Sequence, residues 1–414
     1  MSAPTAAVVG GGVIGSAVAH YFSKAGWNVV IVERNAFGSG CSHANCGLVV
    51  PSHILPMAAP GAIWNVLKTM FKPRSPVRLK PRIDFRLWSW LFQFARRCNR
   101  HDMLAAAEGI KALLDSSRSL FVELLRDEKM AVEWEEKGLL FVFQSNAPFE
   151  HFAETNELLA EKFDAPARKM TGAELTVFEP TLKDGNAGGW LYESDAQLRP
   201  DRLMSEWKRS LERRGVRIME NCEARELIRD GRSAKAVRTS HGDVDVDAVV
   251  FAVGAWTPLH SNLIGCRLPI QPGKGYSLTM ERPRECPRMP MIFEEHRVAL
   301  TPFPSGLRLG SMMEFNGYDA VLDRDRLSIL REGAAHYLKE PLDGAVHEEW
   351  WGWRPMTVDG NPFIDRAPNW ENVWVAAGHS MLGLSQAPAT GKLLVELATG
   401  GAPHVDPKPY RIGR

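Results

Sequence analysis

The chain has 414 residues, of which 45% are hydrophobic and 24% charged, as in a globular protein with a sizeable core. Its 50 Lys and Arg against 49 Asp and Glu leave a net charge of +1, which excludes a protein-wide affinity for polyanions such as nucleic acid. Six scattered cysteines, no signal peptide and no apolar run of ~18 residues predict a cytoplasmic protein with reduced thiols. His, Cys and acidic residues show no metal-ligand spacing, so we expect no metal site.

The first predicted element, residues 6–33, is a strand, a Gly-rich turn, a helix and a second strand that ends in an acid. Gly10, Gly12 and Gly15 fill the G-x-G-x-x-G spacing, which lets a pyrophosphate approach a helix N-terminus. Glu33 follows about 20 residues later, where a carboxylate binds a ribose hydroxyl and disfavours the 2′-phosphate of NADP. The motif predicts a dinucleotide without deciding between NAD and FAD; the alternative is a Gly-rich turn in an ordinary βαβ unit.

The next segments are a small, polar loop over residues 34–47 and an irregular, Pro-containing crossing over residues 48–62. Residues 63–100 then carry ten Lys or Arg against one acid, Asp84, with seven Trp or Phe interleaved. One interpretation is an amphipathic helical pair whose aromatic side chains enter the core. The other is a peripheral membrane or partner surface, since basic helices with aromatic residues suit anionic interfaces. Nothing else in the chain supports nucleic acid as a partner.

The remaining periodicity predicts an α/β protein with an inserted β-rich part. Helices are expected over 103–129, 148–162, 199–214, 323–339 and 386–399, and strands over 132–144 (two), 189–193, 215–218, 223–239 (a meander), 247–256, 266–320 (several), 348–354 and 373–379. Two later strands end in Gly turns, at Gly254 and Gly378, which should face the same ligand as the first motif. The predicted dinucleotide domain comprises 1–54, 195–262 and 351–414, and the substrate domain 55–194 and 263–350.

Seven motifs together resemble the D-amino acid oxidase family of flavoproteins, and within it the bacterial D-amino acid dehydrogenases. The motifs span nearly the whole chain, at residues 10–15, 41–51, 58–61, 252–256, 272–277, 352–360 and 378–383. The resemblance implies a discontinuous Rossmann-like FAD-binding domain with an inserted substrate domain of mixed β-sheet and helices. It also implies FAD rather than NAD.

The resemblance further implies which residues hold FAD: Gly10, Gly12, Val13, Ile14, Gly15, Glu33, Arg34, Ser42, Asn45, Gly47, Leu48, Ala224, Gly254, Trp256, Gly378, His379, Gly383 and Leu384. Some relatives attach FAD covalently through a histidine three residues before the glycine of this loop. Here that place, three residues before Gly47, is Ala44, and His43 is one position off. We therefore expect non-covalent FAD.

Oxidation of an amino acid at Cα needs a cation for the carboxylate, best an Arg, because guanidinium binds carboxylate bidentately. Arg354, at the end of a Trp-rich strand, is the candidate; the alternative is a structural Arg paired with Asp359 or Asp365. Three further catalytic candidates, each with a plain structural alternative, are Lys274, Tyr276 and His53.

The predicted activity is FAD-dependent oxidation of D-amino acids or cyclic D-imino acids, with the electrons passed to a quinone or another acceptor. One alternative is an O₂-using oxidase of the glycine or sarcosine type. Another, from a different class, is a non-catalytic flavoprotein subunit of a larger complex, and an NAD-dependent Rossmann enzyme is a distant third. The basic, aromatic segment 63–100 would suit a protein on the cytoplasmic face of the inner membrane.

Overall fold

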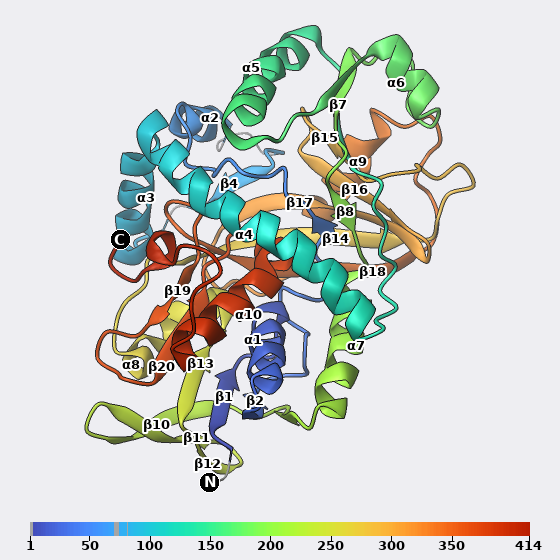
Figure 1. Cartoon of the computed structure of the whole chain (residues 1–414). Helices are drawn as coiled ribbons and strands as arrows, with labels where there is room; N and C mark the ends of the chain where they lie inside the picture. Colours follow the sequence, from blue (N-terminus) through green and yellow to red (C-terminus); the bar gives the residue numbers. More distant parts are fainter. Residues whose placement is uncertain (1–2, 70–73, 81) are drawn as a thin grey trace.

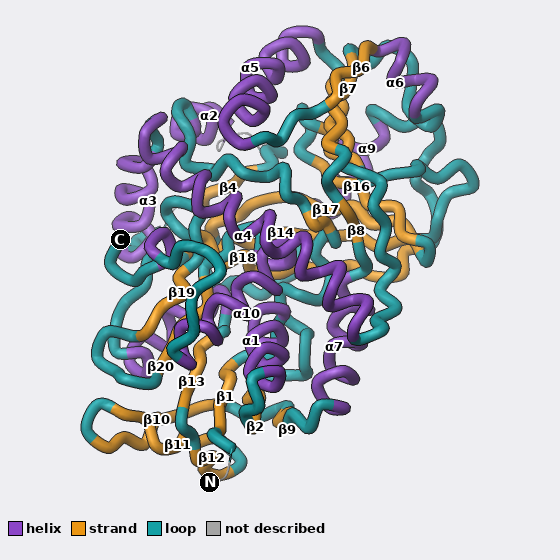
Figure 2. The backbone as a smooth tube through the Cα atoms, viewed as in Figure 1, coloured by secondary structure: helices purple, strands orange, loops and turns teal. Residues whose placement is uncertain are grey.

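The computed structural model describes residues 3–69, 74–80 and 82–414, which form two large sheets with helices around them (Figure 1). Phe71 and Lys72 of the basic, aromatic segment lie outside the described residues. Helices and strands alternate in the lower half of the view, whereas strands dominate the right-hand part of the upper half (Figure 2).

The first sheet has six strands in the order β19-β20-β13-β1-β2-β9. All neighbours in it pair in parallel except the edge strand β19, which is antiparallel to β20. Both faces are covered, so its strands are near-continuous runs of Val, Ile and Ala. The strands are β1 (Thr5–Val9), β2 (Asn28–Val32), β9 (Arg217–Met219), β13 (Ala248–Phe251), β19 (Phe363–Arg366) and β20 (Val373–Ala377).

One face of this sheet packs against α1 (Val13–Lys24), α7 (Pro200–Arg213) and α10 (Gly383–Thr399). Helices α1 and α10 cross so closely that a Cβ on Gly391 would lie 2.5 Å from the carbonyl carbon of Ala17. Glycine at position 391 therefore permits this crossing. The other face packs against the meander β10 (Ala224–Asp230), β11 (Ser233–Thr239) and β12 (Gly242–Asp245), and against the short helices η1 (Gly254–His260) and α8 (Ser261–Ile264).

The second sheet is mixed and mainly antiparallel, in the order β18-β14-β17-β16-β15-β5-β7-β6, with β4 beside β17. Its long strands β14 and β18 pair from Gln271 with Met356 to Met280 with Val346. The strands are β4 (Val77–Leu79), β5 (Leu139–Phe143), β6 (Arg168–Thr171), β7 (Gly188–Tyr192), β14 (Gln271–Met280), β15 (Met291–Phe293), β16 (Val298–Phe303), β17 (Gly306–Phe315) and β18 (Val346–Met356). A separate small pair joins β3 (Leu48–Val49) to β8 (Ala196–Gln197).

The remaining helices cover the second sheet and link it to the first. They are α2 (Ala62–Thr69), α3 (Phe85–Arg97), α4 (Arg100–Asp127), α5 (Asn146–Phe163), α6 (Gly172–Phe178), α9 (Arg324–Ala335) and the single turn η2 (Lys408–Tyr410). Helix α4 runs across the molecule and packs on α10 (Figure 1). Its Leu113 and Phe121 belong to the hydrophobic core of the first sheet, although α4 falls in the range predicted for the substrate domain. The domain boundaries themselves stay a prediction.

Most predicted elements are present, and the predicted α/β class with a Rossmann-like first sheet is confirmed. The prediction of two strands over 132–144 was wrong, because this stretch holds one strand, β5. The residues before it turn through Glu133, whose φ is 54°, and meet Gln197 by a single bridge at Glu135. Strand β6 and helix α6 were not predicted. The predicted helical pair of residues 63–100 exists as α2 and α3, with β4 between them.

Among the described residues, none of the helices combines the length and the hydropathy needed to cross a bilayer.

Candidate active site

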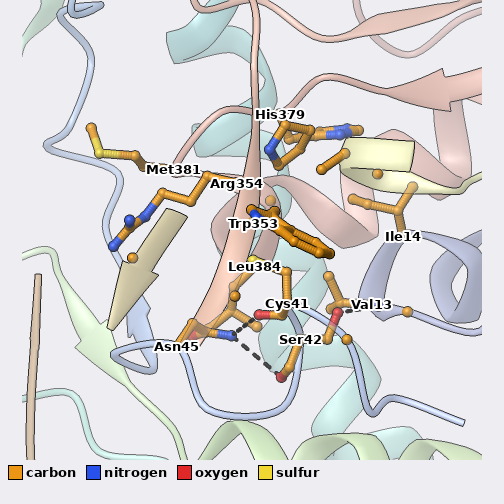
Figure 3. A pocket seen from close by; sticks show the side chains of 18 of the residues that line it. Val13, Ile14, Cys41, Ser42, Asn45, Trp353, Arg354, His379, Met381 and Leu384 are labelled. Carbon is orange, nitrogen blue, oxygen red and sulfur yellow. Dashed lines mark hydrogen bonds between the residues drawn. The ribbon is translucent and has the colours of Figure 1, made fainter. Parts of the chain in front are cut away.

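A cavity of about 420 Å³ lies where the two sheets meet (Figure 3). Its walls come from β1, α1, β2, the loop before β3, the turn after β13, the facing strands β14 and β18, and the turn into α10. Segments more than 300 residues apart in sequence therefore share one site. In the part of the chain that the structure describes, no group of His, Cys or acidic residues could hold a metal ion.

The Gly-rich turn forms one end of this cavity. Gly10 has a φ of +110°, and a Cβ there would lie 2.5 Å from the carbonyl oxygen of Ala252. A Cβ on Gly15 would lie 1.9 Å from the carbonyl oxygen of Gly10, which explains how α1 packs so closely on β1. Gly12, Val13 and Ile14 line the cavity, and the first turn of α1 contains no acidic residue. The positive end of the α1 dipole is thus available to a phosphate group.

Glu33 is held in place beside this turn. Its Oε2 accepts a hydrogen bond from Gly11 N (2.7 Å) and its Oε1 accepts one from Asn35 N (2.8 Å). A carboxylate oxygen has two lone pairs, so each oxygen keeps one for a ribose hydroxyl. Ala224, Gly254, Arg34 and Trp256 line the same cavity. The Arg34 guanidinium lies 5.5 Å from the Trp256 ring centroid.

The loop after β2 closes the cavity from another side. Ser42 Oγ accepts a hydrogen bond from Val13 N (2.9 Å), and Asn45 Oδ1 accepts one from Gly47 N (2.9 Å). Ser42, Asn45 and Leu48 line the cavity, whereas Gly47 does not and shapes the turn with a φ of +73°. His43 Nε2 lies 2.7 Å from Glu348 Oε1, and this hydrogen bond raises the pKa of His43.

The turn into α10 brings a second helix N-terminus to the cavity. His379, Gly383 and Leu384 line it, while Gly378 lies behind them in the turn with a φ of +87°. His379 is buried, its Nε2 lies 3.0 Å from Thr390 Oγ1, and burial lowers its pKa to about 3, so the imidazole is neutral. No acidic residue occupies the first turn of α10. This helix end favours negative charge on a ring bound beside it.

Arg354 projects from β18 into the cavity and is half-buried (Figure 3). Its Nη1 donates to Met312 O (2.8 Å) and its Nη2 donates to Ser311 O (3.4 Å). The alternative of a structural ion pair with Asp359 or Asp365 was wrong. Asp359 pairs with Arg414 (2.9 Å), and the Asp365 side chain accepts from Ile412 N (2.8 Å). Among the described residues, Arg354 has no carboxylate partner.

Gly275 on the facing strand β14 makes room for this guanidinium, because a Cβ there would lie 1.9 Å from Arg354 Nη1. Lys274 and Tyr276, its neighbours, project to the opposite face of the sheet. The Tyr276 hydroxyl donates to Glu314 Oε2 (2.9 Å), and Lys274 Nζ donates to Val321 O. Their polar ends line a second hollow of about 400 Å³ behind the sheet, although Tyr276 also borders the main cavity. Contact of these two side chains with the substrate stays a prediction.

His53 lines the cavity, as we predicted for a candidate substrate contact, and its ring lies 5.7 Å from the Phe141 ring. Sequence reasoning missed several other lining residues. Trp353 precedes Arg354 and packs edge-to-face on Trp256 at 5.5 Å, and Met381 is half exposed at the mouth. Both lie in motifs that carried the family resemblance, at 352–360 and 378–383, but the sequence did not single out either side chain as a site residue.

Comparison with known proteins agrees with this geometry. A family model described as "FAD dependent oxidoreductase" matches residues 5–397. A protein named D-amino acid dehydrogenase from Granulibacter bethesdensis is 30% identical over 413 residues, covering 98% of both chains. Another of that name, from Methylobacterium nodulans, is 31% identical over 409 residues, covering 96% of both.

Solved structures share the fold at lower sequence identity. Glycine oxidase from Geobacillus kaustophilus superposes with a TM-score of 0.81 at 22% identity, covering 99% of both chains. L-proline dehydrogenase from P. horikoshii superposes with a TM-score of 0.75 at 20% identity, covering 99% of this chain and 97% of the other. The residues present fit FAD, because two helix N-termini without acidic residues face one elongated cavity that runs from Gly12 to Arg354. The chain belongs to the family of FAD-dependent oxidoreductases.

Proposed function

We propose that this protein is a dehydrogenase that oxidises D-amino acids or cyclic D-imino acids of the proline type. The observation that carries the proposal is the Arg354 guanidinium, which faces the cavity and has no carboxylate partner among the described residues. Two of its five N–H donors bond carbonyl groups, so three remain for a substrate carboxylate. Two relatives named D-amino acid dehydrogenase, 30% and 31% identical over nearly the full chain, support the choice of substrate class.

The chain's own residues bind and orient the substrate. Arg354 holds the carboxylate, Trp353 and Met381 enclose the rest of the molecule, and the buried neutral His379 adds no charge beside the ring. FAD supplies the hydride acceptor when bound, so the protein has to position Cα and exclude competing reactions. The N-terminus of α10 stabilises the negative charge that reduction brings.

Anaerobic bleaching of the flavin absorbance tests this function. The FAD-loaded protein is mixed with D- and L-amino acids, D-proline and its hydroxylated form, glycine and sarcosine. We expect the D-enantiomers to bleach the flavin fastest. Faster bleaching by glycine or sarcosine, with hydrogen peroxide formed in air, favours the oxidase instead. A flavin that no amino acid bleaches contradicts catalysis and favours a non-catalytic flavoprotein subunit.

We also propose that electrons leave to a quinone and that the protein is peripheral on the cytoplasmic face of the inner membrane. Helix α3 and Ile83, two residues before it, expose large apolar side chains: Ile83 is 94% exposed, Phe85 84%, Phe92 65% and Trp88 53%. Arg86 and Arg96 are exposed on the same helix. Basic and aromatic side chains together suit an anionic lipid surface. The opposite side of α3 buries Leu87 and Trp90 against the second sheet, so the exposed side is free.

Co-sedimentation with vesicles tests the membrane contact. We expect binding to phosphatidylglycerol vesicles, weaker binding to phosphatidylcholine, and loss of binding in Phe85→Ser and Trp88→Ser. Val177→Ser is the matched control, since Val177 is 80% exposed on α6, far from α3 (Figure 1). Equal vesicle binding by wild type and all variants contradicts the proposal that the exposed side of α3 contacts the membrane. Reoxidation of the bleached flavin by a soluble quinone analogue tests the acceptor, and its absence contradicts a quinone.

A further inference from the structure

A row of hydrogen-bonding groups leads from the cavity to a buried carboxylate. His53 Nδ1 lies 3.4 Å from Ser52 Oγ, and Ser52 Oγ donates to Asp195 Oδ2 at 2.6 Å. Ser52 N also donates to Asp195 Oδ1 at 3.1 Å, which fixes the turn before His53 against the connection between β7 and β8. Asp195 is fully buried, and its carbonyl oxygen accepts from Gly138 N at 3.0 Å.

These bonds decide which nitrogen of His53 carries the proton. The one hydroxyl hydrogen of Ser52 goes to the Asp195 carboxylate, so Ser52 Oγ accepts from His53 Nδ1. Burial lowers the pKa of His53 to about 4, so the ring is neutral and Nε2 is an acceptor. Among the described residues, Nε2 has no hydrogen-bond partner. His53 therefore presents a free acceptor to the cavity that Arg354 shares.

A bound amino acid needs such an acceptor. Its nitrogen is an ammonium near neutral pH, and loss of a hydride from Cα requires a nitrogen lone pair to form the C=N bond. We propose that His53 takes a proton from the substrate ammonium. Ser52 and Asp195 are positioning residues: they orient His53, and a proton passes through the Ser52 hydroxyl to the Asp195 carboxylate. The proposal rests on the amino acid oxidation proposed above.

The transfer balances without any change of oxidation state. The substrate N–H bond breaks and an Nε2–H bond forms on His53. The Nδ1 hydrogen passes to Ser52 Oγ, and the Ser52 hydrogen passes to Asp195 Oδ2, so Asp195 ends neutral. FAD, when bound, would supply the hydride acceptor for a separate step, and no hydride is moved by His53, Ser52 or Asp195.

The surroundings suit Asp195 as the final acceptor. Burial raises its pKa to about 7, against the opposing effects of Ser52 and of Arg118 on α4. A group with a pKa near the working pH accepts and returns protons efficiently. The other ionisable side chain facing it is Tyr192 on β7, and Arg118 itself is paired with Glu136 at 2.6 Å. Among the described residues that line the cavity, the charged groups are Arg297 and Arg354, together with Glu33, Arg34 and Glu223.

Ser52→Ala separates this role from a merely structural one, because it removes the hydroxyl and keeps the main-chain bond from residue 52 to Asp195. Asp195→Asn keeps one oxygen that can accept from Ser52 N, but it replaces the oxygen that faces Ser52 Oγ with an NH2 group and so removes the proton acceptor. Ser194→Ala is the matched control, since Ser194 Oγ touches the same carboxylate at 3.5 Å but lies off the path to His53. FAD affinity and melting temperature are measured for every variant.

The assay is anaerobic stopped-flow reduction of the FAD-loaded enzyme by the best D-amino acid, from pH 6 to pH 10. We expect the wild-type rate to fall below about pH 7. We expect Ser52→Ala and Asp195→Asn to be about 10- to 100-fold slower at pH 7 and to recover at pH 10, where much of the free substrate is already a neutral amine. Ser194→Ala should stay within twofold of wild type.

If the flavin reduction rate of Ser52→Ala matches that of wild type from pH 6 to pH 10, proton transfer through Ser52 to Asp195 is overturned. This holds even if Asp195→Asn is too unstable to assay. A deficit in Ser52→Ala that is constant from pH 6 to pH 10 also overturns it, because a structural defect is not relieved by a neutral substrate. Failure of any amino acid to reduce the wild-type flavin overturns the proposed function instead, so the two failures are distinguishable.

Discussion

Replacing Arg354 by Met should abolish carboxylate recognition while FAD remains bound. Arg354 Nη1 and Nη2 bond the carbonyl groups of Met312 and Ser311, and its other donors face the cavity. Loss of one partner of a buried, hydrogen-bonded charge pair costs about 2–5 kcal/mol. Because Arg354 is only half-buried, we take about 2–4 kcal/mol, which is roughly a 30- to 700-fold increase in KM at about 1.4 kcal/mol per tenfold.

The assay is steady-state oxidation of a D-amino acid and of its carboxamide, which lacks the negative charge. We expect wild type to prefer the acid and Arg354→Met to lose that preference. The matched control is Arg297→Met, since Arg297 also lines the cavity but is 63% exposed and paired with Glu294 at 2.7 Å. An Arg354→Met variant that binds FAD and keeps its KM within threefold of wild type refutes the reasoning.

Three further predictions concern the cofactor site. Gly12→Val should fold, because a Cβ at this position meets only Ser42 Oγ, at 3.1 Å. The valine side chain should block the pyrophosphate and weaken FAD binding by at least about tenfold, measured by flavin fluorescence titration. Unchanged FAD affinity contradicts pyrophosphate binding at this Gly-rich turn. Acid precipitation should leave colourless protein, because Ala44 cannot bond the flavin; retained yellow colour contradicts non-covalent binding. His43→Gln should lower the melting temperature at pH 6 and not at pH 9. The raised pKa of His43 means that its ion pair with Glu348 stabilises the folded protein at pH values below about 6.5, the pKa of histidine in the unfolded chain. This stabilisation is lost as the pH rises through the higher pKa of His43 in the folded protein. Both side chains are about one-third exposed, so the effect is below about 1 kcal/mol, and an equal deficit at both pH values contradicts it.

The cofactor end of the site was predictable because its signals are local. Gly10, Gly12 and Gly15 lie within one strand–helix unit, and Glu33 directly follows the next strand. The turn into α10 was predictable for the same reason, since a buried strand followed by Gly378 recurs at that edge of the sheet.

The substrate end was predictable only in part, because it depends on pairing across distant strands. The sequence pattern around residues 272–277 does not show which face of the strand borders the cavity. In the structure, Gly275 lies on the face toward Arg354 and the cavity, and Lys274 lies on the opposite face. One residue of register exchanges the two faces, so the sequence alone does not show that the Lys274 amine and the Tyr276 hydroxyl lie behind the sheet. Asp195 was missed because its partner, Ser52, lies 143 residues earlier in the chain.

The fit between Gly275 and Arg354 has a consequence for protein engineering. A methyl group at position 275 would collide with the guanidinium, so position 275 cannot be varied while Arg354, 79 residues later in the sequence, is kept in place. A library that randomises position 275 alone would return mostly displaced arginines and inactive enzymes. Joint variation, with a shorter cation at position 354 and a small side chain at position 275, would instead change the depth at which the carboxylate sits.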